Sequence, residues 1–145
     1  MELRIHPLQQ KFDLLYKEMN DLYHETALSQ GISDSAQVIL YTVCELGDGC
    51  LQKDICERSF LTKQTVHSSV RKLEREGFLR LEPGKGRDMH LFLTEQGRAL
   101  AEKTAVPLSR AEYLALDTLA PQEQTELIRL TEAYVAALRT QLQQL

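Results

Sequence analysis

The middle of the chain constrains the fold most, because two short helices are predicted there with almost no linker between them. Apolar residues at helical spacing predict the first helix over residues 52–58, and the three residues 59–61 interrupt it. Thr62 is a good N-cap for the second helix, and Gly77 is placed to end it in the left-handed conformation that glycine adopts easily. The pattern indicates a helix-turn-helix, which leaves one face of its second helix free for a partner.

A β-hairpin is predicted directly after this helix pair. Residues 78–81 and 89–93 are rich in apolar side chains and flank the segment 83–88, which contains one proline and two glycines. The order of helix, turn, helix and hairpin is typical of a winged helix-turn-helix, which places its second helix in the major groove of duplex DNA. We therefore expect a mainly α-helical fold with a small antiparallel β-wing.

Positive charge is concentrated in the same region, although the chain as a whole carries a formal net charge of −4. Residues 62–90 contain seven Lys/Arg and four Asp/Glu, whereas the segments before and after them are net acidic. A basic segment on an acidic protein indicates a local anion-binding surface.

The predicted second helix has two different faces. Val66, Val70 and Leu73 form an apolar seam for packing on the protein body. The other face carries polar and cationic side chains suited to bases and phosphates; Gln64 suits adenine and Arg71 suits guanine. This face could also be an ordinary solvated helix surface. With two cations at the hairpin tip, the predicted DNA-binding residues are Thr62, Lys63, Gln64, Thr65, His67, Ser68, Arg71, Lys72, Lys85 and Arg87.

Amphipathic helices are predicted on both sides of this central region. Pro107 lies inside the segment 94–119 and is expected to kink that helix rather than end it. The apolar periodicity covers the segments 7–27, 33–47, 94–119 and 121–145. In the second of these segments the expected buried stripe is Val38, Ile39, Val43 and Leu46.

At this point the chain resembles the bacterial MarR family (multiple antibiotic resistance regulators). The resemblance rests on LQKDICERSFLTKQTVHSSVRKLEREGFL at residues 51–79, on the glycine-rich wing and on LTEQG at residues 93–97. It implies six helices and a β-wing, with the terminal helices intertwined in a dimer. We accordingly expect one domain over residues 1–145, with a dimerisation region at 1–30 and 100–145 and a DNA-binding lobe at 33–97.

The resemblance also implies a function. Family members are sequence-specific regulators of transcription, usually repressors, that bind pseudo-palindromic duplex DNA as homodimers and are often released by small-molecule effectors. Tyr16, His24, Tyr41 and Tyr113 are candidates for lining an effector pocket, and packing in the core or at the dimer interface is the alternative.

This sequence departs from the family pattern at two places. The wing carries Lys85-Gly86-Arg87 where many members have Asp-x-Arg, so the arginine lacks its usual acidic neighbour. Phe60 occupies a turn position that often holds glycine.

Catalytic, metal and membrane functions find no support in the sequence. It has no CxxC, HxxxH or HExxH spacing, no Walker loop, no GxGxxG and no nucleophile–base pattern. We expect no metal, no cofactor and no enzyme activity. With no signal-peptide pattern and no apolar segment long enough to cross a bilayer, a cytoplasmic protein is expected.

The three cysteines are expected to be free thiols in a reducing cytosol. Cys44 and Cys56 are expected to be small packed residues, whereas Cys50, beside a turn, is expected to be exposed, with redox sensing as the alternative to a structural role. A second hypothesis for the whole chain is a winged-helix module that binds another protein. The acidic net charge favours this hypothesis, and the basic helix face argues against it.

Overall fold

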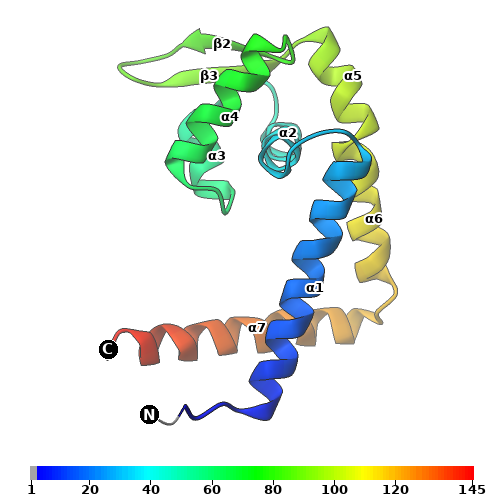
Figure 1. Cartoon of the computed structure of the whole chain (residues 1–145), viewed down its shortest axis with the longest axis vertical. Helices are drawn as coiled ribbons and strands as arrows, with labels where there is room; N and C mark the ends of the chain where they lie inside the picture. Colours follow the sequence, from blue (N-terminus) through cyan, green and yellow to red (C-terminus); the bar gives the residue numbers. More distant parts are fainter. Residues whose placement is uncertain (1–2) are drawn as a thin grey trace. The chain divides into compact units, whose positions relative to one another are not determined.

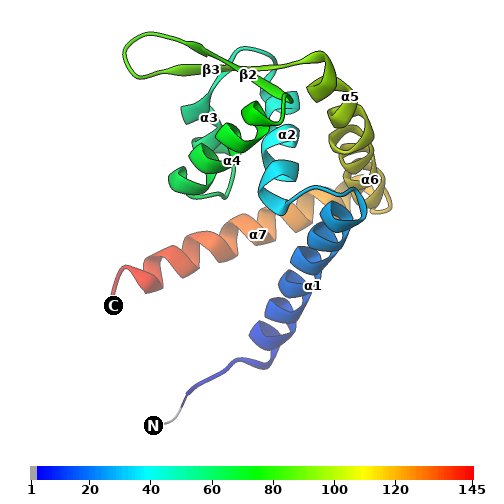
Figure 2. The ribbon, with the colours of Figure 1, turned by 45° about the horizontal axis from the view of Figure 1, so that its top comes forward.

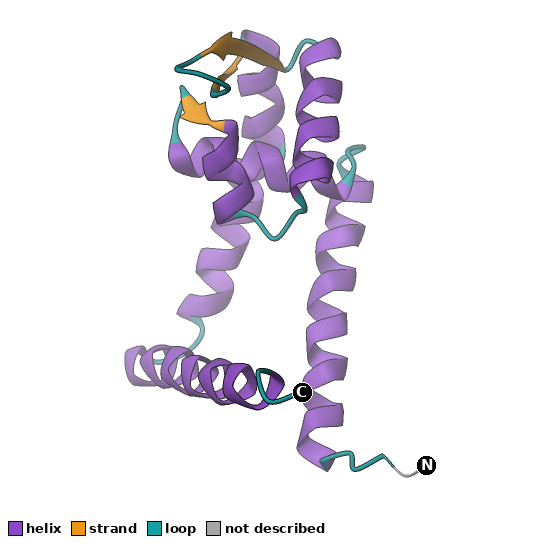
Figure 3. Cartoon of the chain, turned by 90° about the vertical axis from the view of Figure 1, so that its left-hand side faces the viewer, coloured by secondary structure: helices purple, strands orange, loops and turns teal. Residues whose placement is uncertain are grey.

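The computed structural model describes residues 3–145. These residues form two compact units, one ending at residue 107 and the other covering residues 108–145. The described residues are mainly helical, and the three strands lie close to the third and fourth helices (Figure 3). This confirms the expected fold class. In chain order the elements are α1 (Pro7–Ser29), α2 (Asp34–Leu46), β1 (Cys50–Leu51), α3 (Gln52–Arg58), α4 (Lys63–Arg75), β2 (Leu79–Pro83), β3 (Met89–Leu93), α5 (Glu95–Lys103), α6 (Ala105–Asp117) and α7 (Pro121–Leu142) (Figure 1).

The ends of α4 are fixed by the two residues expected to fix them. The Thr62 hydroxyl accepts a hydrogen bond from the Thr65 amide (3.1 Å), which satisfies one of the free N–H groups of the first turn. At the other end Gly77 has φ 82°, and the Phe78 amide donates to the Leu73 carbonyl (2.9 Å). This closure requires a left-handed residue, so glycine ends the helix and sends the chain into β2.

The hydrophobic core of the first unit lies between α2, the helix pair α3–α4 and the sheet. Two of the four residues expected to be buried on α2, Ile39 and Val43, are fully buried. Val38 is only half-buried. Leu46 is exposed, because the helix ends at this residue and the chain then turns toward β1. The most completely buried side chains of the core are Ile39, Val43, Ile55, Val66, Val70 and Leu91.

The sheet contains one strand more than the predicted hairpin. β2 and β3 pair antiparallel, with Leu79 opposite Leu93 and Pro83 opposite Met89. The two-residue strand β1 adds to the other edge of β3, giving the order β1-β3-β2. Two residues are too few to show the alternation that predicts a strand, so β1 has no sequence signal.

The helix expected around Pro107 is broken into two. α5 ends at Lys103, Thr104 lies outside helical geometry (φ −121°, ψ −69°), and α6 begins at Ala105 with Pro107 in its first turn. Proline has no N–H to donate to the residue four positions earlier, and its ring clashes with that residue's carbonyl. That residue is Lys103, where α5 ends. The expected kink is therefore a break.

Gly97 allows α5 to pack closely against Phe78, in the turn between α4 and β2. Thr94 caps α5 by accepting from the Gly97 amide (3.0 Å), and its own amide donates to the Phe78 carbonyl (3.1 Å). A β-carbon added at Gly97 would overlap the Phe78 carbonyl oxygen. The position therefore accommodates only glycine without movement of the backbone.

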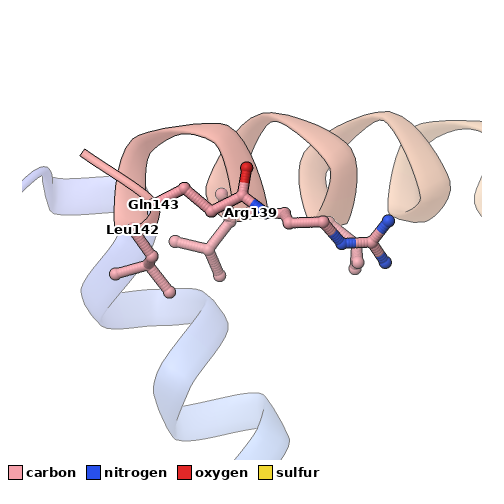
Figure 4. A pocket seen from close by; sticks show the side chains of 5 residues that line it. Arg139, Leu142 and Gln143 are labelled. Atoms are coloured by element: carbon pink, nitrogen blue, oxygen red, sulfur yellow. The ribbon is translucent and has the colours of Figure 1, made fainter. Parts of the chain in front are cut away.

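Two helices, one in each unit, carry apolar side chains that remain exposed. α7 begins at Pro121 as expected and has no buried residue. An open hollow of about 390 Å³ on its last turns is lined by α7 residues, among them Leu142 and Arg139 (Figure 4). None of the helices formed by residues 3–145 has the length and hydropathy of a membrane span. The exposed apolar residues include Leu8, Phe12, Leu15, Met19 and Leu22 on α1, and Leu127, Ile128, Leu130, Tyr134, Val135, Leu138 and Leu142 on α7.

Candidate nucleic-acid interface

The two faces of α4 are separated as the sequence predicts. Val66, Val70 and Leu73 are buried against α2, α3 and the start of β2. The predicted DNA-binding residues lie on the remaining surface of the helix and at its cap, or at the wing tip. All of them are exposed except Thr65, which is half-buried, and together they are Thr62, Lys63, Gln64, Thr65, His67, Ser68, Arg71, Lys72, Lys85 and Arg87.

In the first turns of α4, some side chains form hydrogen bonds within the helix, whereas others form none within the described part of the chain. The hydroxyls of Thr62 and Thr65 lie 2.8 Å apart, and Ser68 donates to the Thr65 carbonyl (3.1 Å). These hydroxyls stabilise the turn while their oxygens keep acceptor capacity. Within the described part of the chain, Lys63 and Gln64 make no hydrogen bond or ion pair, and the first turn holds no acidic residue.

Two cations on the later turns of α4 are paired with acidic neighbours on the same helix. Arg71 donates to Glu74 (2.9 Å), and Lys72 lies 3.9 Å from Glu76. Exposed pairs of this kind contribute little free energy, so a phosphate or a base edge can replace the carboxylate at small cost.

The wing presents its two cations on a turn that is closed by its own backbone. The Gly84 amide donates to the Asp88 carbonyl (2.8 Å), and the Asp88 amide donates to the Lys85 carbonyl (3.1 Å). Gly86 at the tip has φ 63°, a conformation open to glycine. Among the described residues, Lys85 and Arg87 have no ion-pair partner, and the hairpin projects beyond the helices of the first unit (Figure 2).

An ion pair that sequence reasoning missed ties the wing to the helix-turn-helix. Lys53 on α3 lies 3.1 Å from the carboxylate of Asp88. The two residues are 35 positions apart, and no local pattern links them. The carboxylate anchoring the wing thus follows Arg87 instead of preceding it at the position of Lys85.

Comparison with known proteins shows which family the central region resembles. Residues 30–88, which run from the start of α2 to the wing, match the family model described as MarR family. The fold is similar to that of NMB1585, a MarR family regulator from Neisseria meningitidis, at 20% identity and a TM-score of 0.81 over 96% of this chain and 99% of that one. Residues 30–88 thus resemble the MarR family, and the chain as a whole has the fold of MarR-family regulators.

Two further proteins extend the comparison. The MepR–DNA complex from S. aureus is similar in fold, with 20% identity and a TM-score of 0.72 over 93% of this chain and 99% of MepR. The iron-dependent repressor IdeR of Mycobacterium tuberculosis is 36% identical over 89 residues, or 59% of this chain. The chain spans 37% of the length of IdeR.

The four candidate effector-pocket residues lie on three helices, α1, α2 and α6. Tyr16 on α1 is 58% exposed, and His24 on the same helix lies 2.9 Å from Asp34 at the start of α2. Tyr41 on α2 is half-buried, and Tyr113 in the second unit is 71% exposed. None of the four lines the hollow of Figure 4.

The three cysteines are free thiols, and two of them differ from expectation in exposure. Cys44 is exposed rather than packed, because it follows buried Val43 and so points about 100° away around α2. Cys50 is half-buried in β1 rather than exposed, and burial, reinforced by Asp54, raises the pKa of its thiol to about 11. Cys56 packs against the core as expected.

Within residues 3–145 no three His, Cys, Asp or Glu side chains are arranged to hold a metal ion.

Proposed function

We propose that this chain is a MarR-type, sequence-specific regulator of transcription that binds duplex DNA as a homodimer on a pseudo-palindromic site. One observation carries the proposal. A protein of net charge −4 presents, on the exposed face of α4 and at the wing tip, a set of cations and hydrogen-bonding side chains that the described chain leaves unpaired or only weakly paired. Such a surface complements the phosphate backbone and base edges of DNA.

In this proposal α4 is the recognition helix and lies in the major groove. Its N-terminal amides and positive dipole end face a phosphate, while Gln64 and Arg71 reach adenine and guanine edges. Arg87 on the projecting wing enters the neighbouring minor groove, where arginine is favoured. MepR, whose fold is similar, has a solved complex with DNA, which supports this reading of the fold.

The homodimer is supported by the apolar side chains that α1 and α7 leave in water. α7 buries none of its residues within the chain, although seven of its large side chains are apolar. Exposure on this scale marks an interaction surface. We assign dimerisation to residues 1–30 and 100–145 and DNA binding to the lobe 33–97. Two-fold symmetry then sets two half-sites about 34–36 Å apart.

Repression and effector release are the finer parts of the proposal. The partial relative IdeR is a repressor by name, and a dimer seated on DNA would block access to the bound site. An effector would act by binding the dimer more tightly at one spacing of its two DNA-binding lobes than at another. Tyr16, His24, Tyr41 and Tyr113 remain our candidates for that site.

The proposal is tested by titrating the protein with duplex DNA at two salt concentrations. We expect binding that weakens steeply as salt rises, because each neutralised phosphate releases counterions. Binding that is absent, or that does not depend on salt, would contradict the proposal and favour the hypothesis of a protein-binding winged helix.

Arg71→Ala is expected to relax base preference at one position of each half-site and to cost ~1–3 kcal/mol per half-site. The reason is the loss of hydrogen bonds from the guanidinium to a base edge. The measurement is the affinity for a bound duplex and for variants changed at single base pairs. Arg129→Ala is the matched control, because Arg129 on α7 pairs with Glu126 at the same three-residue spacing. It should leave base preference unchanged.

Arg87→Ala is expected to weaken binding to all sequences alike and to reduce the slope of log affinity against log salt by about one unit per subunit. The loss of one phosphate-neutralising cation per wing is the cause. Arg87→Lys keeps the charge and should keep the slope. An unchanged slope in Arg87→Ala would show that the wing does not contact DNA.

A further inference from the structure

Phe60 is the most exposed large apolar residue in the described part of the first unit. It is the middle residue of the turn between α3 and α4, and its side chain is 87% exposed, the highest value for a large apolar residue among residues 3–107. Leu61 packs against the core, and its amide donates to the Ser59 hydroxyl (3.4 Å). The turn is therefore held on both sides of Phe60. The ring gains no burial within the chain, which makes it a candidate contact residue.

We propose that Phe60 packs against the C5-methyl group of a thymine in the major groove and thereby selects thymine at one position of each half-site. The inference rests on the proposed DNA-binding function. Thymine's methyl is the apolar group that base edges present in the major groove. Phe60 is two residues before Thr62, so their Cα atoms are within about 7 Å of each other. A groove that receives the N-terminus of α4 brings its bases within reach of the ring.

The charge around Phe60 favours DNA over a protein partner. Lys63 and Gln64, in the first turn of α4, are exposed and make no hydrogen bond or ion pair within the described chain. That turn has no acidic residue. Arg58, at the end of α3, is the nearest cation on the other side and pairs with Glu45. An apolar ring bordered by free donors and positive charge suits a surface that combines a methyl group with acceptors and phosphates.

The backbone of the turn also fits a role for the side chain itself. No non-glycine residue of the described chain has a positive φ, so Phe60 adopts an ordinary conformation although glycine is frequent at this position in the family. Phe60→Ala should therefore fold normally, since an exposed ring contributes little to stability. A change in DNA binding by this variant would then reflect the lost contact.

The test is a double-mutant cycle between the ring and the methyl group. The probe is the tightest duplex obtained by selection from a random pool, and each symmetric pair of thymines is replaced in turn by deoxyuridine, which lacks the methyl. For the wild type we expect one replacement to weaken binding about fourfold per half-site, as expected for one buried methyl group. Phe60→Ala should bind the parent duplex on the order of tenfold more weakly per half-site and be insensitive to that replacement. Its salt dependence should equal that of the wild type, because no charge changes.

Leu46→Ala is the matched control, because Leu46 is an exposed apolar residue at the end of α2. This variant should bind the parent duplex with the affinity of the wild type. The inference is overturned if Phe60→Ala binds as tightly as the wild type, or if it keeps the full sensitivity to deoxyuridine. It is also overturned if the variant changes the oligomeric state, which would assign Phe60 to a protein contact. A wild type that binds no duplex refutes the proposed function itself, whereas a wild type that selects a palindrome with no role for Phe60 refutes this inference alone.

Discussion

Leu138→Asp is expected to convert the proposed dimer into a monomer and to lower the affinity for a palindromic duplex by about 10²–10⁴-fold. Leu138 is 40% exposed in the single chain and lies in the apolar stripe of α7, which has no buried residue. A carboxylate buried there in the dimer would be unpaired and costly. A monomer holds one half-site at a time and loses the high effective concentration that links the two lobes. Sedimentation and DNA titration measure the two effects.

Thr140→Asp is the control for this variant. It adds the same charge two residues away on the same helix, but about 200° around the axis from Leu138. The Thr140 hydroxyl donates to the Ala136 carbonyl of its own helix (3.1 Å). The control should remain dimeric and bind DNA normally. A dimeric Leu138→Asp, or equal effects of the two variants, would contradict the assignment of α7 to the dimer interface.

Gly97→Ala is expected to destabilise the protein by ~1–3 kcal/mol, although alanine is the better helix former. Helix propensity alone would predict a gain of about 1 kcal/mol. The added methyl group would overlap the Phe78 carbonyl, so α5 must move away from this residue and strain the Thr94–Phe78 hydrogen bond. A fall in the unfolding midpoint of roughly 3–10 °C is expected for a chain of this length. Thermal and urea unfolding measure it.

Ala99→Gly provides the comparison within the same helix. Ala99 is exposed, so this variant should lose only the ~1 kcal/mol that separates glycine from alanine in a helix. If Gly97→Ala proved more stable than the wild type, the close contact between α5 and Phe78 would be absent in solution.

Local signals in the sequence were sufficient for the helices that carry the candidate interface. Thr62, Gly77 and Thr94 each act on neighbouring backbone groups, so their positions fix helix ends without knowledge of the rest of the fold. The buried face of α4 follows from helical periodicity alone. The wing follows from the glycines and proline between two apolar runs.

Features that depend on distant partners could not be predicted in this way. β1 is a strand only because β3 offers it an edge, and the Lys53–Asp88 pair depends on how α3 meets the wing. The predicted exposure was wrong for both Cys44 and Cys50. The exposure of a cysteine depends on which neighbouring side chains cover it and not on its residue type. Pro107 was expected to kink a helix that it breaks, since its effect falls four residues upstream at Lys103.

The candidate interface itself was visible as a pattern of residue types, but the state of its side chains was not. The sequence does not show that Arg71 is engaged by Glu74 while Lys63, Lys85 and Arg87 are unpaired in the described chain. The polar residues next to Phe60 in the sequence also do not show that its ring is almost fully exposed. These details determine which variants separate base recognition from general affinity for DNA.

Selection of bound duplexes from a random pool tests the central claim most directly. If two copies of α4 and the wing meet DNA across a two-fold axis, the selected sequences will converge on an inverted repeat whose half-site centres are about 10–10.5 base pairs apart. Failure to enrich any duplex, or enrichment of sequences without two-fold symmetry, would contradict the claim.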